Sequence, residues 1–448
     1  MDPGPAFDRS TSSPPRALLV DFVRELRCTG DADLVRWCVA PTLLPAIGSA
    51  DRVSRPRMSD ALRNRSAWLP LRRGLEFRRS GGATFASQGG NPLRVLTAIE
   101  AEWQSRVGRS SERVRVHPRW GDLRRWDAAS RTFEAEVADA ARAAGWSLDR
   151  PAVTALASAA ARSLARAEAA LGGTAAPLVV ATQHSIDVRA ALAAARHQEI
   201  TTVYFPHAPM ETSPKYADLP IEHAGLRGEA ERDHYRSIGA RDALDVTGNP
   251  SVSVPLAEDA LPPTVGRPIV LAVPARPSSE LDALLAQVRS ATDAAVVLCP
   301  HPRSDVEWLR ERCPANWTIV TDRPTFDVLR GGAACVLQQS SGVAWESLAL
   351  GLPTIELAPA GAAAYPFIAG PHVLVAPDVA ALREALRSLD GGQSGPGLDR
   401  RALVDVARSW CATTGPEAAS ACADLVERAG ALDGPRPLLL DTWGLPPA

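Results

Sequence analysis

Lysine is almost missing from this sequence of 448 residues, because Lys215 is the one lysine and arginine carries nearly all of the positive charge. No G-x-x-x-x-G-K-[ST] motif and no G-x-G-x-x-G motif occurs, so neither a P-loop nor a dinucleotide-binding fingerprint is supported. No apolar run approaches 18 residues, so we expect no transmembrane helix. The seven cysteines form no C-x-x-C pair, and we expect them to be reduced and buried in a cytoplasmic protein.

Charge is nearly balanced over the whole chain. The formal net charge of −2 implies no general affinity for nucleic acid. The exception is residues 52–79, where nine arginines face only Asp60 and Glu76. Two interpretations stay open: a solvated basic surface, or a patch that attracts an anionic acceptor or the acidic inner leaflet of a membrane, as a peripheral contact.

The length predicts two domains, each large enough for its own core. Residues 16 to about 125 show little pattern, and the polar, Pro-rich N-terminus lacks the form of a signal peptide. Packing of the C-terminal helices back onto the N-terminal domain is left open. The predicted divisions are a disordered N-terminus (1–15), an N-terminal domain (16–250), a Pro-rich linker (251–268), a C-terminal domain (269–395), and C-terminal helices with a tail (400–448).

Strands and helices alternate in both predicted domains. In the first, apolar runs at 178–182 and 201–205 flank a helical stretch at 185–198, which predicts a βαβ unit with parallel strands. In the second, the alternation continues from 268 to 390 with short loops. The pattern predicts an α/β fold with Rossmann-like, doubly wound sheets.

Two histidines follow the two strands of the first domain. Ligands of parallel sheets bind beyond the carboxyl ends of the strands. His184 follows the first strand, and His207 follows the second, so both should lie on one rim. We therefore expect a functional histidine here, with His207 ahead of His184.

The stretch 334–355 reads as strand, loop, helix, turn and strand. Ser340 or Ser341 can cap the helix, whose first free N–H groups and positive dipole end make a place for a phosphate. Glu346, one turn further, suits ribose hydroxyls. An ordinary capped helix stays the alternative.

A second group follows another strand of the same domain. His301, Pro302 and Arg303 come directly after the apolar run 294–299, and the histidine and arginine offer donors and positive charge. On the same rim should lie the loop formed by Gln339, Ser340, Ser341 and Gly342. No acidic cluster has metal-ligand spacing, so we expect neither a metal nor a cofactor, and the side chains and the helix dipole would supply the positive charge.

These motifs carry a family resemblance over residues 178–390. The chain resembles nucleotide-sugar glycosyltransferases of the GT-B architecture, in which two Rossmann-like domains face a cleft. It is most similar to the bacterial branch with a histidine–proline motif, which includes capsule, sialic acid and CDP-glycerol transferases. The resemblance implies phosphate contacts from His301 and from the serine pair, and places His207, in VYFPHA, at the cleft. Ala208 departs from the glycine more usual in the family, and the two acids and glycine of the sialyltransferase base motif are absent.

The implied function is transfer of a sugar, or a sugar-like group, from a nucleotide-activated donor to an acceptor hydroxyl. The acceptor would be a saccharide or lipid-linked molecule in cell-surface polysaccharide or glycoconjugate synthesis. His207 would be the general base, with His184 and Asp187 as alternatives. Two other functions remain: a non-hydrolysing nucleotide-sugar 2-epimerase, whose arginine-rich signature loop is missing from 358–371, or a catalytically inactive GT-B binding protein.

Overall fold

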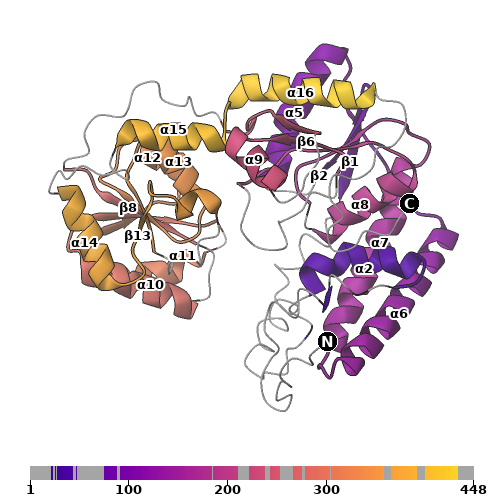
Figure 1. Cartoon of the computed structure of the whole chain (residues 1–448), viewed down its shortest axis with the longest axis horizontal. Coiled ribbons are helices and arrows are strands. Elements are labelled where there is room, and N and C mark those ends of the chain that lie inside the picture. Colours follow the sequence, from indigo (N-terminus) through magenta and orange to yellow (C-terminus); the bar gives the residue numbers. More distant parts are fainter. Residues whose placement is uncertain are drawn as a thin grey trace.

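The structure is a computed structural model, and the residues that it describes form two α/β lobes (Figure 1). The predicted N-terminal disorder, most of the basic segment, most of the linker and the C-terminal tail lie outside the described residues, as do His184 and Arg303. The described residues are 22–23, 26, 28–43, 47, 75–87, 91–183, 185–209, 221–237, 243–252, 266–274, 278–302, 304–357, 365–390 and 399–431.

Each lobe is built on one sheet, and the predicted α/β class with two Rossmann-like domains is confirmed. The N-terminal sheet contains β1 (Glu76–Ser80), β2 (Ala83–Ser87), β3 (Glu112–Arg113), β4 (Leu178–Val180), β5 (Thr202–Tyr204), β6 (His223–Leu226) and β7 (Leu244–Val246). The C-terminal sheet contains β8 (Ile269–Val273), β9 (Val296–Pro300), β10 (Trp317–Ile319), β11 (Val336–Gln338), β12 (Thr354–Glu356) and β13 (Leu374–Val375).

Helices cover both sheets. Those of the N-terminal part are α2 (Asp31–Leu43), α5 (Asn91–Val107), α6 (Trp120–Ala143), α7 (Arg150–Leu171), α8 (Ile186–His197) and α9 (Glu229–Ser237). Those that follow are α10 (Ser278–Ala291), α11 (Val306–Arg312), α12 (Thr325–Arg330), α13 (Val343–Ala349), the 3₁₀ helix η3 (Pro366–Ala369), α14 (Val379–Asp390), α15 (Arg400–Trp410) and α16 (Gly415–Gly430).

The N-terminal sheet has the strand order β3-β1-β2-β4-β5-β6-β7 and is parallel from β2 to β7. Strand β1 runs antiparallel to β2 and β3, and the sequence interpretation missed this hairpin. Gly81 and Gly82 make its two-residue turn with φ of 47° and 92°, values that residues with a Cβ rarely adopt. Helices α2, α6, α7 and α8 cover one face of the sheet, and α5 and α16 cover the other (Figure 1).

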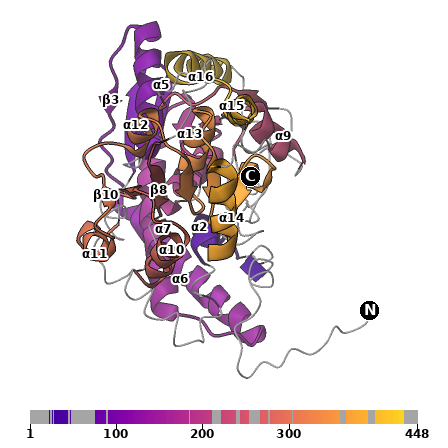
Figure 2. The ribbon, with the colours of Figure 1, turned by 90° about the vertical axis from the view of Figure 1, so that its left-hand side faces the viewer.

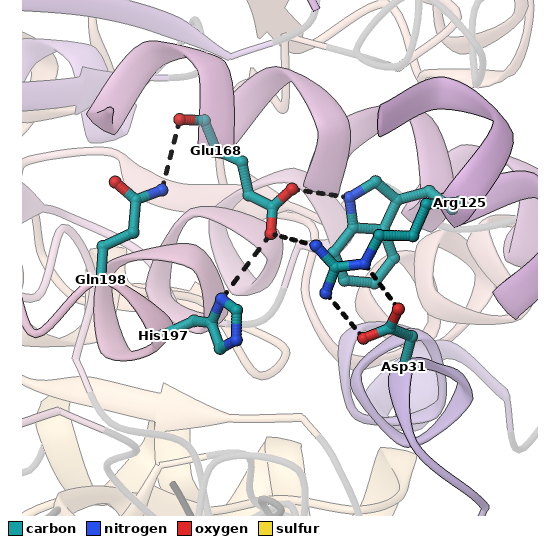
Figure 3. A network of polar contacts seen from close by, with 6 residues as sticks. Asp31, Arg125, Glu168, His197 and Gln198 are labelled. Carbon is teal, nitrogen blue, oxygen red and sulfur yellow. Dashed lines mark hydrogen bonds and ion pairs between the residues drawn. The ribbon is translucent and has the colours of Figure 1, made fainter. Parts of the chain in front are cut away.

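A polar network ties the helical layer together (Figure 3). The carboxylate of Glu168 in α7 accepts a hydrogen bond from Trp126 Nε1 at 2.8 Å, and its other oxygen lies 3.4 Å from Arg125. Arg125 in turn forms two hydrogen bonds with Asp31 of α2, at 2.6 and 2.7 Å. His197 of α8 reaches the same carboxylate at 3.8 Å. The network fixes helices from four places in the sequence behind the sheet.

The C-terminal sheet is parallel throughout, with the order β10-β9-β8-β11-β12-β13. This is the 3-2-1-4-5-6 order of Rossmann-like sheets, whose ligand crevice opens where the order reverses, here between β8 and β11. Helices α12 and α13 lie on one side of the strands, and α10 and α14 lie on the other (Figure 2). The fold therefore directs a ligand to the loops after β8, β9 and β11.

After the C-terminal sheet, the described chain returns to the N-terminal lobe. Helix α15 packs on α13, and α16 packs on α5 (Figure 1). Between them, Ala412 N donates to Arg227 O at 2.8 Å, and Asn249 N donates to Thr413 O at 2.9 Å. Gly248 has φ of 82°, and a Cβ there would lie 2.2 Å from Thr413 O. A side chain at that position would separate the crossing segment from the loop after β7.

In the part of the chain that the structure describes, no helix is long and apolar enough to cross a membrane.

Candidate functional site

A cavity of about 720 Å³ lies between the two lobes, where strands of both sheets end. The lobes approach closely across it, because a Cβ built on Gly342 would lie 3.9 Å from Pro209 Cδ. Residues that follow six strands line it: His207 after β5, Arg227 after β6, Asn249 after β7, Pro274 after β8, His301 after β9, and Ser340 after β11.

His207 stands on the N-terminal wall with its ring orientation set by the backbone. Its Nδ1 lies 2.7 Å from the carbonyl oxygen of Ala181. Because a carbonyl only accepts, Nδ1 carries the proton, and Nε2 keeps a lone pair. Burial lowers the pKa of His207 below its ordinary value, the hydrogen bond to Ala181 opposes this shift, and the charge of Arg227 adds to it. The ring is therefore neutral at neutral pH and able to take a proton.

Arg227, next to this histidine, is a site residue that the sequence interpretation missed. It follows β6 directly and is only 2% exposed. Its guanidinium carbon lies 5.0 Å from the centroid of the Trp345 ring in α13, so it reaches from one lobe to the other. Its Nε has no hydrogen-bond partner among the described residues. The signal that would have found it is the strand-end rule that found His207.

The serine loop forms the opposite wall, but three backbone amides here are already bound. Ser340 N donates to both carboxylate oxygens of Glu356 at 3.1 Å, and Ser341 N donates to Gln338 Oε1 at 2.7 Å. Val343 N donates to Ser341 Oγ at 3.3 Å. Helix α13 begins at Val343, after Gly342. The predicted phosphate cradle of free amides is therefore wrong for these three groups, whereas the two serine side chains do line the cavity.

Neighbouring strands explain this arrangement. Gln338 and Glu356 are paired across β11 and β12, and Gln338 Nε2 donates to Glu356 Oε2 at 2.6 Å. The carboxylate thus holds the end of β11 and the start of the loop together. Ser340 has φ of 50°, in the left-handed region that costs a residue other than glycine free energy. The two bonds to Glu356 hold it in this conformation.

Glu346 lies on the inner wall, one turn into α13. Burial raises the pKa of Glu346 to about 7, and the charge of Arg227 acts in the opposite direction. Near neutral pH this carboxyl group is therefore divided between its ionised and neutral forms. It can accept a hydrogen bond from a ligand hydroxyl in the first form and donate one in the second.

The structure brings most of the predicted residues together and separates others. Those that line the cavity are His207, His301, Pro302, Ser340, Ser341, Gly342 and Glu346. Gln339 is not among the lining residues. The placement of Asp187 as an alternative base in this cavity is corrected. Its carboxylate accepts a hydrogen bond from Ser163 of α7 and lines a separate cavity of about 220 Å³, because the first turn of α8 faces α7.

Further residues line the cavity that the sequence interpretation did not single out. Arg94 comes from α5, and Phe326, Asp327 and Arg330 come from α12. Tyr365, which the sequence placed on the same rim in the loop before η3, also lines the cavity. No group of three or more His, Cys, Asp or Glu side chains suited to a metal ion occurs within the described ranges. Independence of a metal stays a prediction.

No protein-family model and no curated protein matches this chain. Among solved structures, it is similar to S. aureus MnaA in complex with UDP, with 14% identity over 58% of this chain and 76% of that chain and a TM-score of 0.42. It is also similar to UDP-GlcNAc 2-epimerase from Neisseria meningitidis bound to UDP-GlcNAc, with 14% identity over 60% of this chain and 81% of that chain and a TM-score of 0.42. A third similar structure is that of CalG4, the calicheamicin glycosyltransferase, with 18% identity over 60% of this chain and 78% of that chain and a TM-score of 0.41. Similarity at this level assigns neither an activity nor a substrate to this chain.

Proposed function

We propose that this protein is a nucleotide-sugar-dependent glycosyltransferase of the GT-B type, which moves a sugar or sugar-like group to an acceptor hydroxyl. The observation that carries the proposal is one cavity that holds a neutral imidazole on one wall and hydroxyl, imidazole and carboxyl groups on the other. The acceptor is a saccharide or lipid-linked molecule of cell-surface polysaccharide or glycoconjugate synthesis in the cytoplasm. The similarity to the histidine–proline branch stays part of the proposal.

The donor binds the C-terminal wall, at the reversal of strand order between β8 and β11. Its phosphates lie near His301 and the hydroxyls of Ser340 and Ser341, and its ribose hydroxyls meet Glu346. A carboxyl group with a pKa near 7 suits a hydroxyl partner better than a phosphate, since its ionised form would repel a phosphate.

The acceptor hydroxyl enters from the N-terminal wall. His207 takes its proton at Nε2, while the hydrogen bond from Nδ1 to Ala181 holds the ring in place. The low pKa of His207 keeps it deprotonated at neutral pH, which a general base requires. Closure of the lobes around both substrates would exclude water, so that the group is transferred rather than hydrolysed.

The test has two arms. A thermal-shift screen with CMP, CDP, UDP, GDP and dTDP should show stabilisation by one nucleotide over the others, because a ligand that binds only the folded state raises its stability. With a sugar carried by that nucleotide, release of the nucleotide should then require an added acceptor.

Three outcomes would contradict the proposal. If none of the five nucleotides bound, the proposed donor site would be contradicted. Interconversion of the nucleotide sugar without an acceptor, followed by NMR, would assign the epimerase reaction instead. Nucleotide binding without release in the presence of a broad acceptor mixture would indicate an inactive binding protein.

A further inference from the structure

Arg227 is a cation that the fold buries at the boundary of the two lobes, with 2% of its surface exposed. Its guanidinium stands over the Trp345 ring and lines the cavity. The Nε atom is buried and has no hydrogen-bond partner among the described residues. Burying a charge is costly unless other groups compensate for it. The site thus holds a buried N–H donor for which the described part of the protein supplies no acceptor.

On the opposite wall, three backbone amides are not available to an anion. The amides of Ser340, Ser341 and Val343 are bound within the loop. Helix α13 has only seven residues, so its dipole is small. The charge of an anion in this cavity must therefore be balanced by side chains.

Among the cationic side chains that line the cavity, Arg227 has the least exposed position. Arg94 and Arg330 are exposed to solvent, where screening weakens an ion pair. A guanidinium away from water interacts more strongly, and one held over an aromatic ring keeps N–H groups at its edge for a bidentate contact with phosphate.

We propose that Arg227 binds the phosphate groups of the donor from the N-terminal lobe and stabilises the charge of the leaving group. This inference rests on the proposed function. In the transfer, the bond between the sugar carbon and the phosphate oxygen breaks, and the acceptor oxygen bonds to that carbon. The acceptor proton moves to Nε2 of His207, and the electron pair of the broken bond stays on the phosphate oxygen, where Arg227 meets it.

The experiment measures binding of inorganic pyrophosphate, and of each nucleoside diphosphate beside its parent nucleoside, by calorimetry. The variants are Arg227→Gln, Arg227→Lys and Arg227→Met, the last of which keeps the side-chain bulk without the polar head. Arg236→Gln is the control, since Arg236 is an exposed arginine of α9 that does not line the cavity. Circular dichroism and thermal melting confirm that each variant is folded.

Losing a charge-assisted contact should weaken pyrophosphate and diphosphate binding by roughly 10- to 100-fold in the Gln and Met variants, and less in the Lys variant. Affinity for the parent nucleosides should stay within about twofold, because they carry no phosphate. The control should match the wild type. A second readout is the NMR titration of His207, whose pKa should rise in Arg227→Gln because the charge that lowers it is gone.

Pyrophosphate binding that is absent from the wild type, or unchanged in the Gln and Met variants, would overturn the inference. Equal loss of diphosphate and nucleoside would do the same, since it would indicate a structural role. Normal transfer with pyrophosphate binding independent of Arg227 overturns this inference alone and leaves the proposed function standing. Pyrophosphate binding that depends on Arg227, in a protein without transfer activity, supports the anion site and overturns the proposed function.

Discussion

The two walls of the cavity differ in how far their polar groups are already bound. On the C-terminal wall, Glu356 and Gln338 bind the amides of the serine loop, so the loop is held in one shape. On the N-terminal wall, the Nδ1 atom of His207 binds the carbonyl of Ala181, and Arg227 Nε has no partner among the described residues. The C-terminal lobe therefore supplies a fixed surface, and the N-terminal lobe supplies groups that are still able to react or bind.

The first test of this comparison is His207, for which we expect the largest effect. His207→Ala should lower kcat by about 10²- to 10⁴-fold, the usual contribution of a general base, with little change in nucleotide affinity. His207→Asn keeps a donor for the carbonyl of Ala181 but has no basic nitrogen, so it should lose as much activity as the alanine variant. Steady-state kinetics and calorimetry separate the two quantities.

His234→Ala is the matched control, because His234 lies on α9 and does not line the cavity. In the wild type, the acid limb of the kcat/KM profile should lie below pH 6.5, since the pKa of His207 is lowered and only its neutral form accepts a proton. Near-normal turnover in His207→Asn would remove the histidine from the mechanism.

The second prediction concerns the fixed wall. Glu356 is 1% exposed and holds Gln338 and the Ser340 amide. Glu356→Ala removes the acceptor of the buried Gln338 side chain and of the half-buried Ser340 amide, and should lower the free energy of unfolding by about 2–4 kcal/mol. Urea denaturation measures the loss. Glu384→Ala on α14, where the glutamate pairs with Arg387 at the surface, should change stability by less than about 0.5 kcal/mol. Equal losses in the two variants would mean that the loop does not depend on Glu356.

Glu346 provides a third test, through the pH dependence of stability. Its pKa is raised to about 7 in the folded protein, so folding disfavours the ionised form. Wild-type stability should therefore fall as the pH rises from 4.5 to 7 and change no further from this group above that range. Glu346→Gln removes this penalty and should be about 3 kcal/mol more stable than the wild type at pH 8, and about equal at pH 4. Denaturation curves across this range check the sign, and a constant difference at all pH values would contradict it.

Much of the fold followed from strand–helix alternation, because parallel strands buried on both faces are continuous apolar runs. The hairpin of β1 and β2 did not, although its Gly81-Gly82 turn is a known hairpin signal. Its first strand, EFRRS, falls at the end of the arginine-rich segment and has only one large apolar residue, Phe77. Charge therefore masked the strand pattern.

The site followed in part from one rule, that ligands meet the carboxyl ends of parallel strands. The rule found His207, His301 and the serine loop, and all of these residues except Gln339 line the cavity. It applied equally to Arg227 after β6, but in a chain rich in arginine this one arginine did not stand out from the others. The occupied amides were beyond sequence reasoning, because they depend on Gln338 and Glu356 meeting across two strands 18 residues apart.

Ser340 offers the smallest expected effect and the finest test of how the fixed wall is held. Its φ of 50° is strained for a residue with a Cβ, and this conformation directs its amide at Glu356. Ser340→Gly and Ser340→Ala both remove the hydroxyl, but only glycine adopts this conformation without strain. The glycine variant should therefore be more stable than the alanine variant by about 1 kcal/mol, while both lose the same nucleotide affinity. Paired urea denaturation curves resolve such a difference. Equal stability of the pair would mean that the loop relaxes when its hydroxyl is removed, and then the rigid half of the comparison between the two walls would not hold.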